Sequence, residues 1–97
     1  MADQTITCNG SCYNVDNEQV DKNPNSNIQI AAPVGATLTW DTGTPVTPPL
    51  SKVVQAGGLV TWAVPANAAA GTYYYTPTGM GCDTPCSGPD RPSMKVS

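Results

Sequence analysis

The sequence predicts an all-β domain, namely a two-sheet antiparallel Greek-key β-sandwich of seven or eight strands. Apolar residues alternate with polar ones in several short segments, which is the period of a strand with one buried face. Turn-forming residues separate these segments, and the 97-residue chain holds 10 Pro and 9 Gly but no Phe. This composition suits short strands joined by turns better than helices. The length predicts one domain over residues 1–97, with a thin core.

The N-terminal third predicts a hairpin followed by a loop. Residues 4–8 alternate polar and apolar side chains, and Asn9-Gly10 is typical of a tight turn. Residues 11–15 are then the returning strand. Residues 17–27 contain Pro24 and four Asn, which indicate a loop.

The middle of the chain predicts four strands. The strands at residues 27–32 and 35–40 each present one buried face. Their inward positions are Ile28, Ile30, Ala36, Leu38 and Trp40. Residues 41–50 carry three prolines and therefore indicate a loop. The segments 52–55 and 59–64 flank Ala56-Gly57-Gly58, which predicts a hairpin between them.

The C-terminal third predicts two strands around a long loop. Residues 66–70 are long enough for one helical turn at most. Residues 71–76 form a strand with three consecutive Tyr, and residues 76–92 form a loop rich in Gly, Pro and Cys. Residues 93–97 close the chain as a short strand with Met94 and Val96 on one face.

The composition disfavours several classes of function. The chain contains no His, which excludes Ser-His-Asp and Cys-His catalysis and imidazole-ligated metals. The formal net charge is −3 with only four Lys and Arg, so we expect no nucleic-acid binding. No apolar stretch approaches the ~20 residues of a spanning helix, so we expect no membrane insertion. We expect the protein not to be an enzyme.

Residues 27–97 resemble the cupredoxin family. Gly35-Ala-Thr-Leu-Thr-Trp40 resembles the cupredoxin strand G-x-x-V-x-W, and residues 53–64 resemble the hairpin that follows it. Gly71-Thr-Tyr-Tyr-Tyr75, a loop and Met94-Lys-Val96 resemble the C-terminal G-x-Y-x-Y, ligand loop and M-x-x-x-V ending, with a shorter last spacing. The resemblance implies a cupredoxin-like sandwich.

The copper ligands of that family do not carry over to this chain. Cys82 and Cys86 match the C-x-x-x-C of binuclear copper members, but Asp90 stands at the position of the His. Met94 lies one place beyond the expected Met, and Pro77 stands where single-copper members have their Cys. A blue-copper site needs two His, so the resemblance implies a cupredoxin-like domain without its copper.

An immunoglobulin-like sandwich is the alternative fold. Gly71-Thr72-Tyr73 resembles a tyrosine corner, in which the Tyr hydroxyl bonds back to the backbone upstream. The Cys expected two places later is Tyr75 in this chain.

The four cysteines, Cys8, Cys12, Cys82 and Cys86, allow three interpretations. We expect two disulfides, because paired cysteines in a small acidic domain suit an oxidising compartment. The alternatives are a thiolate site for zinc, an iron–sulfur cluster or copper, and a redox-active dithiol. The C-x-x-x-C spacing of the cysteines departs from the C-x-x-C spacing that is usual for zinc sites and for redox-active dithiols. We therefore expect no cofactor.

The disulfide pairing is open among three connectivities. A crosslink from Cys8 to Cys82 would constrain the unfolded chain more than a local one, by roughly 4.5 against ~2 kcal/mol. Geometry favours the local pair Cys8–Cys12 if Asn9-Gly10-Ser11 forms a three-residue hairpin loop. A two-residue loop would place these two cysteines on opposite faces. We expect local pairs.

The other conspicuous side chains predict packing or solvation. Tyr74 lies on one face of its strand and Tyr73 and Tyr75 on the other, which is typical of sandwich packing more than of an aromatic binding platform. No spacing indicates raised pKa values among the acidic residues, so a solvated role is expected. These residues are Asp16, Glu18, Asp83 and Asp90.

Together these features predict a non-enzymatic structural or protein-interaction module, secreted or surface-displayed, and a subunit of a larger assembly or an accessory domain. Its expected location is extracellular, periplasmic or at the cell surface, since the first residues look like a mature N-terminus with an added Met. We expect a protein partner or self-assembly, with contacts through the loop at residues 77–92. The alternative is an electron-transfer or metal-binding protein that uses the cysteine pairs.

Overall fold

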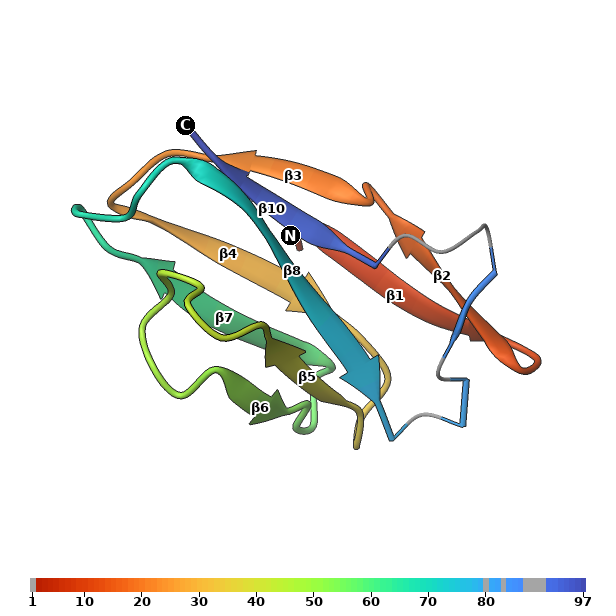
Figure 1. Ribbon diagram of the computed structural model, residues 1–97. Helices are drawn as coiled ribbons and strands as arrows, with labels where there is room; N and C mark the ends of the chain where they lie inside the picture. The colour runs from red at the N-terminus through yellow and green to blue at the C-terminus, as the bar shows by residue number, and fades with distance from the viewer. Residues whose placement is uncertain (1, 80, 83, 87–90) are drawn as a thin grey trace.

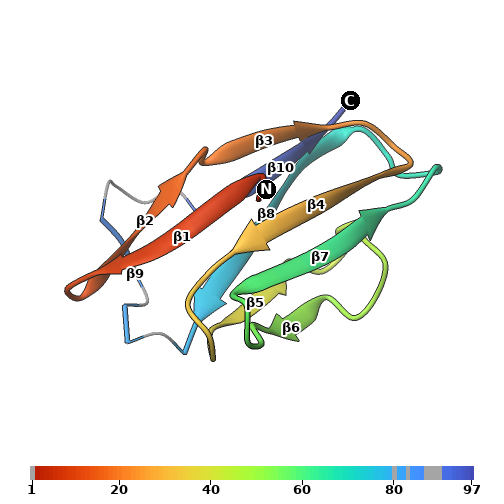
Figure 2. The same ribbon diagram turned by 180° about the vertical axis from the view of Figure 1, so that it is seen from behind.

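Two β-sheets lie face to face and enclose the core (Figure 1, Figure 2). The computed structural model describes residues 2–79, 81–82, 84–86 and 91–97. Within these residues ten strands form two five-stranded sheets: the first sheet has the order β7-β4-β1-β2-β9 and the second sheet β3-β10-β8-β5-β6. The strands are β1 (Gln4–Asn9), β2 (Cys12–Asp16), β3 (Gln19–Lys22), β4 (Ser26–Ala31), β5 (Thr37–Trp40), β6 (Ser51–Val53), β7 (Leu59–Val64), β8 (Gly71–Thr78), β9 (Thr84–Pro85) and β10 (Ser93–Val96).

The all-β prediction is confirmed, but both sheets are mixed rather than antiparallel. Three neighbouring pairs run parallel: β1 with β4, β2 with β9, and β3 with β10. The chain passes from the first sheet to the second between β2 and β3. β3 therefore lies beside β10, the last strand of the chain, and not beside β2, which precedes it. Since no short hairpin joins β3 to β10, these two strands can run in the same direction.

The two strands beyond the predicted eight are β3 and β9, and both lie in segments that were predicted as loops. β3 has a single apolar residue, Val20, which is half-buried. Its alternation is too weak to predict a strand, and its backbone partners come from β10, far along the chain. β9 has two residues and pairs with β2.

The predicted hairpin between residues 52–55 and 59–64 is wrong, although both strands exist. β6 pairs with β5 in the second sheet, whereas β7 pairs with β4 in the first. The connection crosses between the sheets through Gly57 and Gly58, which both have positive φ. The Ala32 amide donates to the Gly58 carbonyl at 2.9 Å and aligns the start of β7 with β4.

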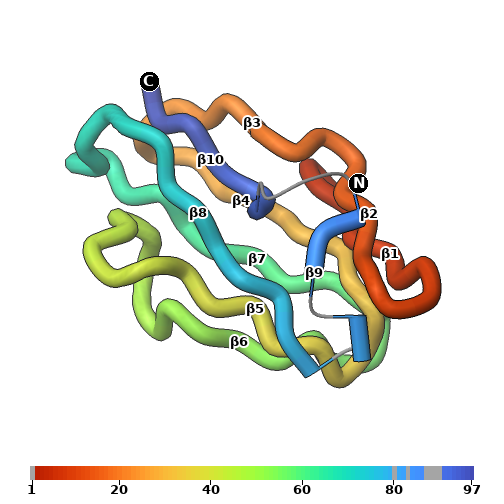
Figure 3. Tube along the Cα trace, turned by 45° about the vertical axis from the view of Figure 1, so that its right-hand side comes forward, coloured from red at the N-terminus to blue at the C-terminus, as the bar shows by residue number. Residues whose placement is uncertain are grey.

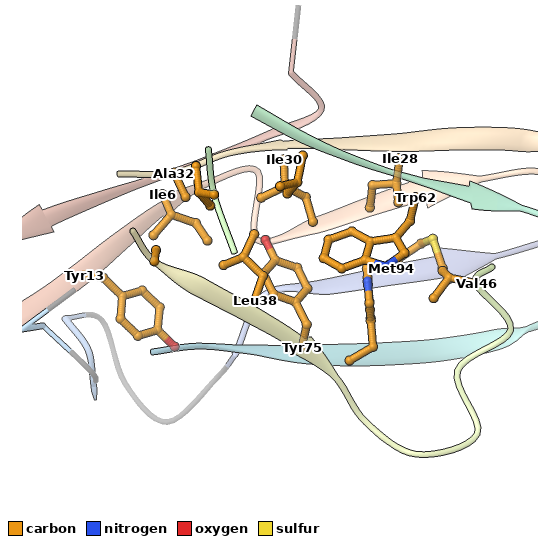
Figure 4. Close-up of a cluster of buried hydrophobic side chains, with 14 of the residues drawn as sticks. Ile6, Tyr13, Ile28, Ile30, Ala32, Leu38, Val46, Trp62, Tyr75 and Met94 are labelled. Atoms are coloured by element: carbon orange, nitrogen blue, oxygen red, sulfur yellow. The ribbon is translucent and has the colours of Figure 1, made fainter. Parts of the chain in front are cut away.

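The predicted inward faces are confirmed. Ile28 and Ile30 of β4 face Leu38 and Tyr75 of the opposite sheet across the core (Figure 4). The buried residues also include Ala36, Trp40, Met94 and Val96, as their alternation predicted. The largest buried side chains are aromatic: Trp40, Trp62, Tyr13 and Tyr75.

Edge contacts between rings centre on Trp40. The centroid of its ring lies 5.8 Å from that of Trp62 and 4.8 Å from that of Tyr75, and both pairs have edge-to-face geometry. The Trp62 indole N–H donates to the Pro49 carbonyl at 2.8 Å. The Trp40 indole N–H is buried and has no hydrogen-bond partner among the residues that the structure describes.

Two predictions for the segment that enters β8 have different outcomes. Residues 66–70 form a turn rather than a helical segment, with the Ala68 amide bonded to the Pro65 carbonyl at 3.1 Å. The Tyr73 hydroxyl donates to the Ala69 carbonyl at 2.8 Å. This bond back to the upstream backbone is the interaction expected of a tyrosine corner.

Gln4 is a buried polar residue that joins the two sheets. Its amide Nε2 donates to the carbonyls of Asn17, Glu18 and Ser93 at 2.9–3.1 Å. Its Oε1 accepts a hydrogen bond of 3.0 Å from the Tyr75 hydroxyl. The side chain thus satisfies backbone groups where the chain changes sheet, together with a hydroxyl that burial makes costly to leave unpaired.

We predict that Gln4→Leu lowers the free energy of unfolding by about 2–4 kcal/mol, because it leaves the buried Ser93 carbonyl and the buried Tyr75 hydroxyl without this partner. Urea denaturation followed by tryptophan fluorescence measures the change. Thr5→Ala on the same strand is the control and should change stability by less than about 0.5–1 kcal/mol. Equal losses in both variants would contradict a bridging role for Gln4.

Candidate functional site

All four cysteines form disulfides, as predicted, but the pairing is long-range. Cys8 bonds to Cys82 and Cys12 bonds to Cys86, each across a sequence separation of 74 residues. The Cα atoms are 5.8 and 4.9 Å apart, within the usual range for a disulfide. The expected local pairs, Cys8–Cys12 and Cys82–Cys86, are therefore wrong.

The register of the β1–β2 hairpin explains the pairing. Asn9 lies opposite Cys12 and Cys8 lies opposite Tyr13, so the loop has two residues, Gly10 and Ser11, instead of three. Opposed residues share a face and successive residues alternate, so Cys8 and Cys12 point to opposite faces. Each must find its partner elsewhere in the chain.

The partners lie in the segment that runs alongside β2 at the same end of the molecule (Figure 3). β9 pairs with β2 in parallel, and the Cys86 amide donates to the Tyr13 carbonyl at 2.8 Å. Cys82 is fully buried against the core. We call the β1–β2 hairpin together with residues 82 and 84–86 the disulfide-tied end.

The loop predicted at residues 77–92 is only partly described. Thr78 and Pro77 belong to β8, which is longer than predicted. Pro77 fits in this strand because β10 pairs with β8 only at residues 71–74, so no neighbour needs its missing N–H on that side. Asp83 and Asp90 lie outside the described residues.

Disulfide bonding sets the chemistry of the four sulfur atoms. A thiolate is both the metal ligand and the nucleophile, and a disulfide sulfur is neither. The zinc, iron–sulfur, copper and redox alternatives therefore apply only to a reduced chain. In the described ranges no group of three or more Cys, Asp or Glu side chains is arranged to hold a metal ion.

A second feature is a pocket of about 240 Å³ on the outer face of the second sheet. Ser93 of β10 lies in register with Gln19 of β3 on one side and with Tyr74 of β8 on the other. These three residues form one row across three neighbouring strands, and Glu18 and Arg91 also line the pocket. We call this the Tyr74 pocket.

Arg91 lies at one wall of the Tyr74 pocket and is bonded to two neighbouring side chains. Its guanidinium donates to both carboxylate oxygens of Asp41 at 2.8 and 2.7 Å and to the Thr76 hydroxyl at 2.8 Å. It also lies over the Tyr74 ring, 5.5 Å from the centroid. The hydrogen bond from Arg91 lowers the pKa of Asp41, so the pair persists at neutral pH and weakens only as acid protonates the carboxylate.

The packing predicted for the aromatic residues is confirmed in the core but not for Tyr74, and the two acidic residues that the structure describes are exposed as predicted. Trp40, Trp62 and Tyr75 are core residues, whereas Tyr74 is 39% exposed. Asp16 and Glu18 are exposed, as expected, although Glu18 also lines the Tyr74 pocket. The sequence does not reveal this pocket, because its residues come from three separate segments of the chain.

Two disulfides in a domain of this size indicate an oxidising, extracytoplasmic environment. No helix in the described part of the chain is long and apolar enough to cross a bilayer. Searches of protein-family models, curated proteins and solved structures find no match to this chain. The molecule is a two-sheet all-β domain with two disulfides.

Proposed function

We propose that this protein is a non-enzymatic structural or protein-interaction module, secreted or displayed at a surface, that acts by contacting a protein partner or further copies of itself. The observation that carries the proposal is the use of all four cysteines to tie one hairpin to one C-terminal segment. Sulfur committed in this way maintains a shape and performs no chemistry. Segments held rigidly on a sandwich are suited to recognition.

For the fold, we propose a cupredoxin-like Greek-key sandwich without copper. Support comes from the segments that resemble that family, since β5, β8 and β10 are neighbours in the second sheet. The immunoglobulin-like alternative has support from the Tyr73 hydroxyl bond to Ala69. The proposed role is the same for the cupredoxin-like and the immunoglobulin-like fold. In both, the four cysteines form disulfides and hold no cofactor.

The proposed contact surface is the disulfide-tied end. Its hairpin loop, Gly10 and Ser11, is exposed, and Thr84 is exposed on β9 at the edge of the first sheet. An edge strand presents backbone groups that can pair with another chain. The disulfides keep this edge ordered before contact, which reduces the entropy lost on binding.

Size-exclusion chromatography with light scattering on untagged protein tests self-assembly. We expect a mass that is a multiple of the 10.0 kDa chain and that rises with concentration. Thr84→Lys should return the protein to a monomer, because a charge on an edge strand opposes edge pairing. Thr72→Lys, on the exposed face of β8, is the matched control and should not. A monomer at every concentration would contradict self-assembly and require a separate partner.

Intact mass and elemental analysis of natively purified protein test the absence of a thiolate site. The isolated chain should be about 4 Da lighter than the reduced chain, since each disulfide removes two hydrogens. A reduced mass on isolation together with stoichiometric zinc, iron or copper would overturn the proposal in favour of the electron-transfer or metal-binding alternative.

A further inference from the structure

We propose that the Tyr74 pocket binds one ring of a neutral saccharide. This inference is independent of the proposed protein contacts, because the pocket lies on the outer face of the second sheet and uses none of the cysteines. It rests on four properties of the pocket: its size, its charge, its hydrogen-bonding groups and its exposed aromatic ring.

The size and the lining favour a small polar ligand. The volume of about 240 Å³ is below the roughly 300–1,000 Å³ of sites for drug-sized ligands. All five side chains that line the pocket in the described part of the chain end in polar or charged groups, and one of them, Tyr74, also carries an aromatic ring. A lipid or a long apolar side chain would leave these groups unpaired.

The charge disfavours an anion. Among the described residues of the lining Arg91 is the one that is basic, and Asp41 already pairs with it through both carboxylate oxygens. Glu18 adds a further negative charge at the pocket, and the chain as a whole carries −3. A phosphate or carboxylate would therefore meet a neutralised guanidinium in a negative field.

The hydrogen-bonding groups suit hydroxyls. A sugar hydroxyl both donates and accepts, so it needs both kinds of partner nearby. The Gln19 amide can do either, whereas the Ser93 hydroxyl donates to the Glu18 carbonyl at 3.5 Å and so serves as an acceptor. Three of the five N–H donors of Arg91 bond to Asp41 and Thr76, which leaves two without a partner in the described residues.

The aromatic ring supplies a stacking surface. Tyr74 is 39% exposed, and the Arg91 guanidinium lies over one face of its ring. The C–H face of a sugar ring can pack against the part of the ring that stays exposed while the sugar hydroxyls reach the polar lining. Because Arg91 is itself held by Asp41 and Thr76, little ordering is needed on binding.

Titration of ¹⁵N-labelled protein with glucose, galactose, mannose and N-acetylglucosamine tests this proposal by NMR. We expect at least one of the four to bind with a Kd on the order of 1 mM, as suits a single small ring. The amide shifts should centre on Gln19, Tyr74 and Ser93. No shift with any of the four sugars would overturn the proposal, as would shifts centred elsewhere.

Two variants and one anionic probe complete the test. Tyr74→Ala should weaken binding about tenfold, because it removes the stacking surface, whereas Tyr74→Phe should retain it. Thr72→Ala, two residues along the same face of β8, is the control and should bind as the parent does. Equal weakening by Thr72→Ala, or tighter binding of glucose 6-phosphate than of glucose, would overturn the proposal. Amide-shift dispersion shows that each variant is folded.

Discussion

Removal of either disulfide alone is expected to lower the free energy of unfolding by about 2.5–3 kcal/mol, and removal of both by about 7 kcal/mol. The single-disulfide variants are Cys8→Ala with Cys82→Ala, and Cys12→Ala with Cys86→Ala. Small domains have total stabilities of about 5–15 kcal/mol, so the chain without disulfides should be largely unfolded.

The first and second disulfides removed have unequal effects on the free energy of unfolding, because the two disulfides join nearly the same two places in the chain. Either disulfide alone closes a loop of about 75 residues in the unfolded chain, which is worth roughly 4.5 kcal/mol. Once that loop is closed, the second disulfide closes a ring of only about ten residues, worth roughly 2.7 kcal/mol. The first removal therefore costs the smaller amount and the second removal the larger.

Guanidinium denaturation of the parent and the two single-disulfide variants measures this effect. The two variants serve as controls for each other, because Cys82 is fully buried and Cys86 is half-buried. Similar losses in both would indicate that loop closure, and not the packing of the sulfur atoms, determines the result. A loss near 4.5 kcal/mol from each single variant would show independent crosslinks and contradict this account.

Trp40→Ala is expected to lower the free energy of unfolding by about 3–5 kcal/mol. The side chain is 2% exposed and contacts the rings of Trp62 and Tyr75, so its removal leaves a large cavity between the sheets. Thermal or urea denaturation measures the loss. A loss below about 1 kcal/mol would place Trp40 at the surface in solution and contradict the packing described above.

Phenylalanine variants separate the ring from its N–H group. Trp40→Phe removes a buried donor that has no partner among the described residues, whereas Trp62→Phe also breaks a 2.8 Å bond to the Pro49 carbonyl. Both lose similar apolar volume. We therefore expect Trp62→Phe to be the more destabilising by about 1 kcal/mol, the net contribution of one hydrogen bond.

Alternation of side chains was sufficient to predict the core of the second sheet. Leu38 and Trp40 in β5, and Met94 and Val96 in β10, have the period of a strand with one buried face, and all four are buried. Prediction failed where a strand depends on a distant partner. β3 offers Val20 alone as an apolar signal, and its backbone bonds come from β10.

Connections between strands were harder to predict than the strands themselves. The glycine pair Gly57-Gly58 suits a turn within one sheet and a crossing between sheets equally well, and only the partners of β6 and β7 decide between them. Cysteine pairing was sensitive to a single residue of hairpin register. A loop of two residues instead of three moved Cys8 and Cys12 to opposite faces and reversed the predicted pairing.

The twin crosslinks also determine how the domain responds to mechanical tension. A pull applied upstream of Cys8 and downstream of Cys86 travels through sulfur–sulfur bonds and bypasses the 74-residue span that each bond closes. Only the first part of β1 and the short β10 remain to be peeled away. Once these two ends have detached, the strands between the crosslinks would bear no further load, and the domain would extend no further until a reductant opened both bonds.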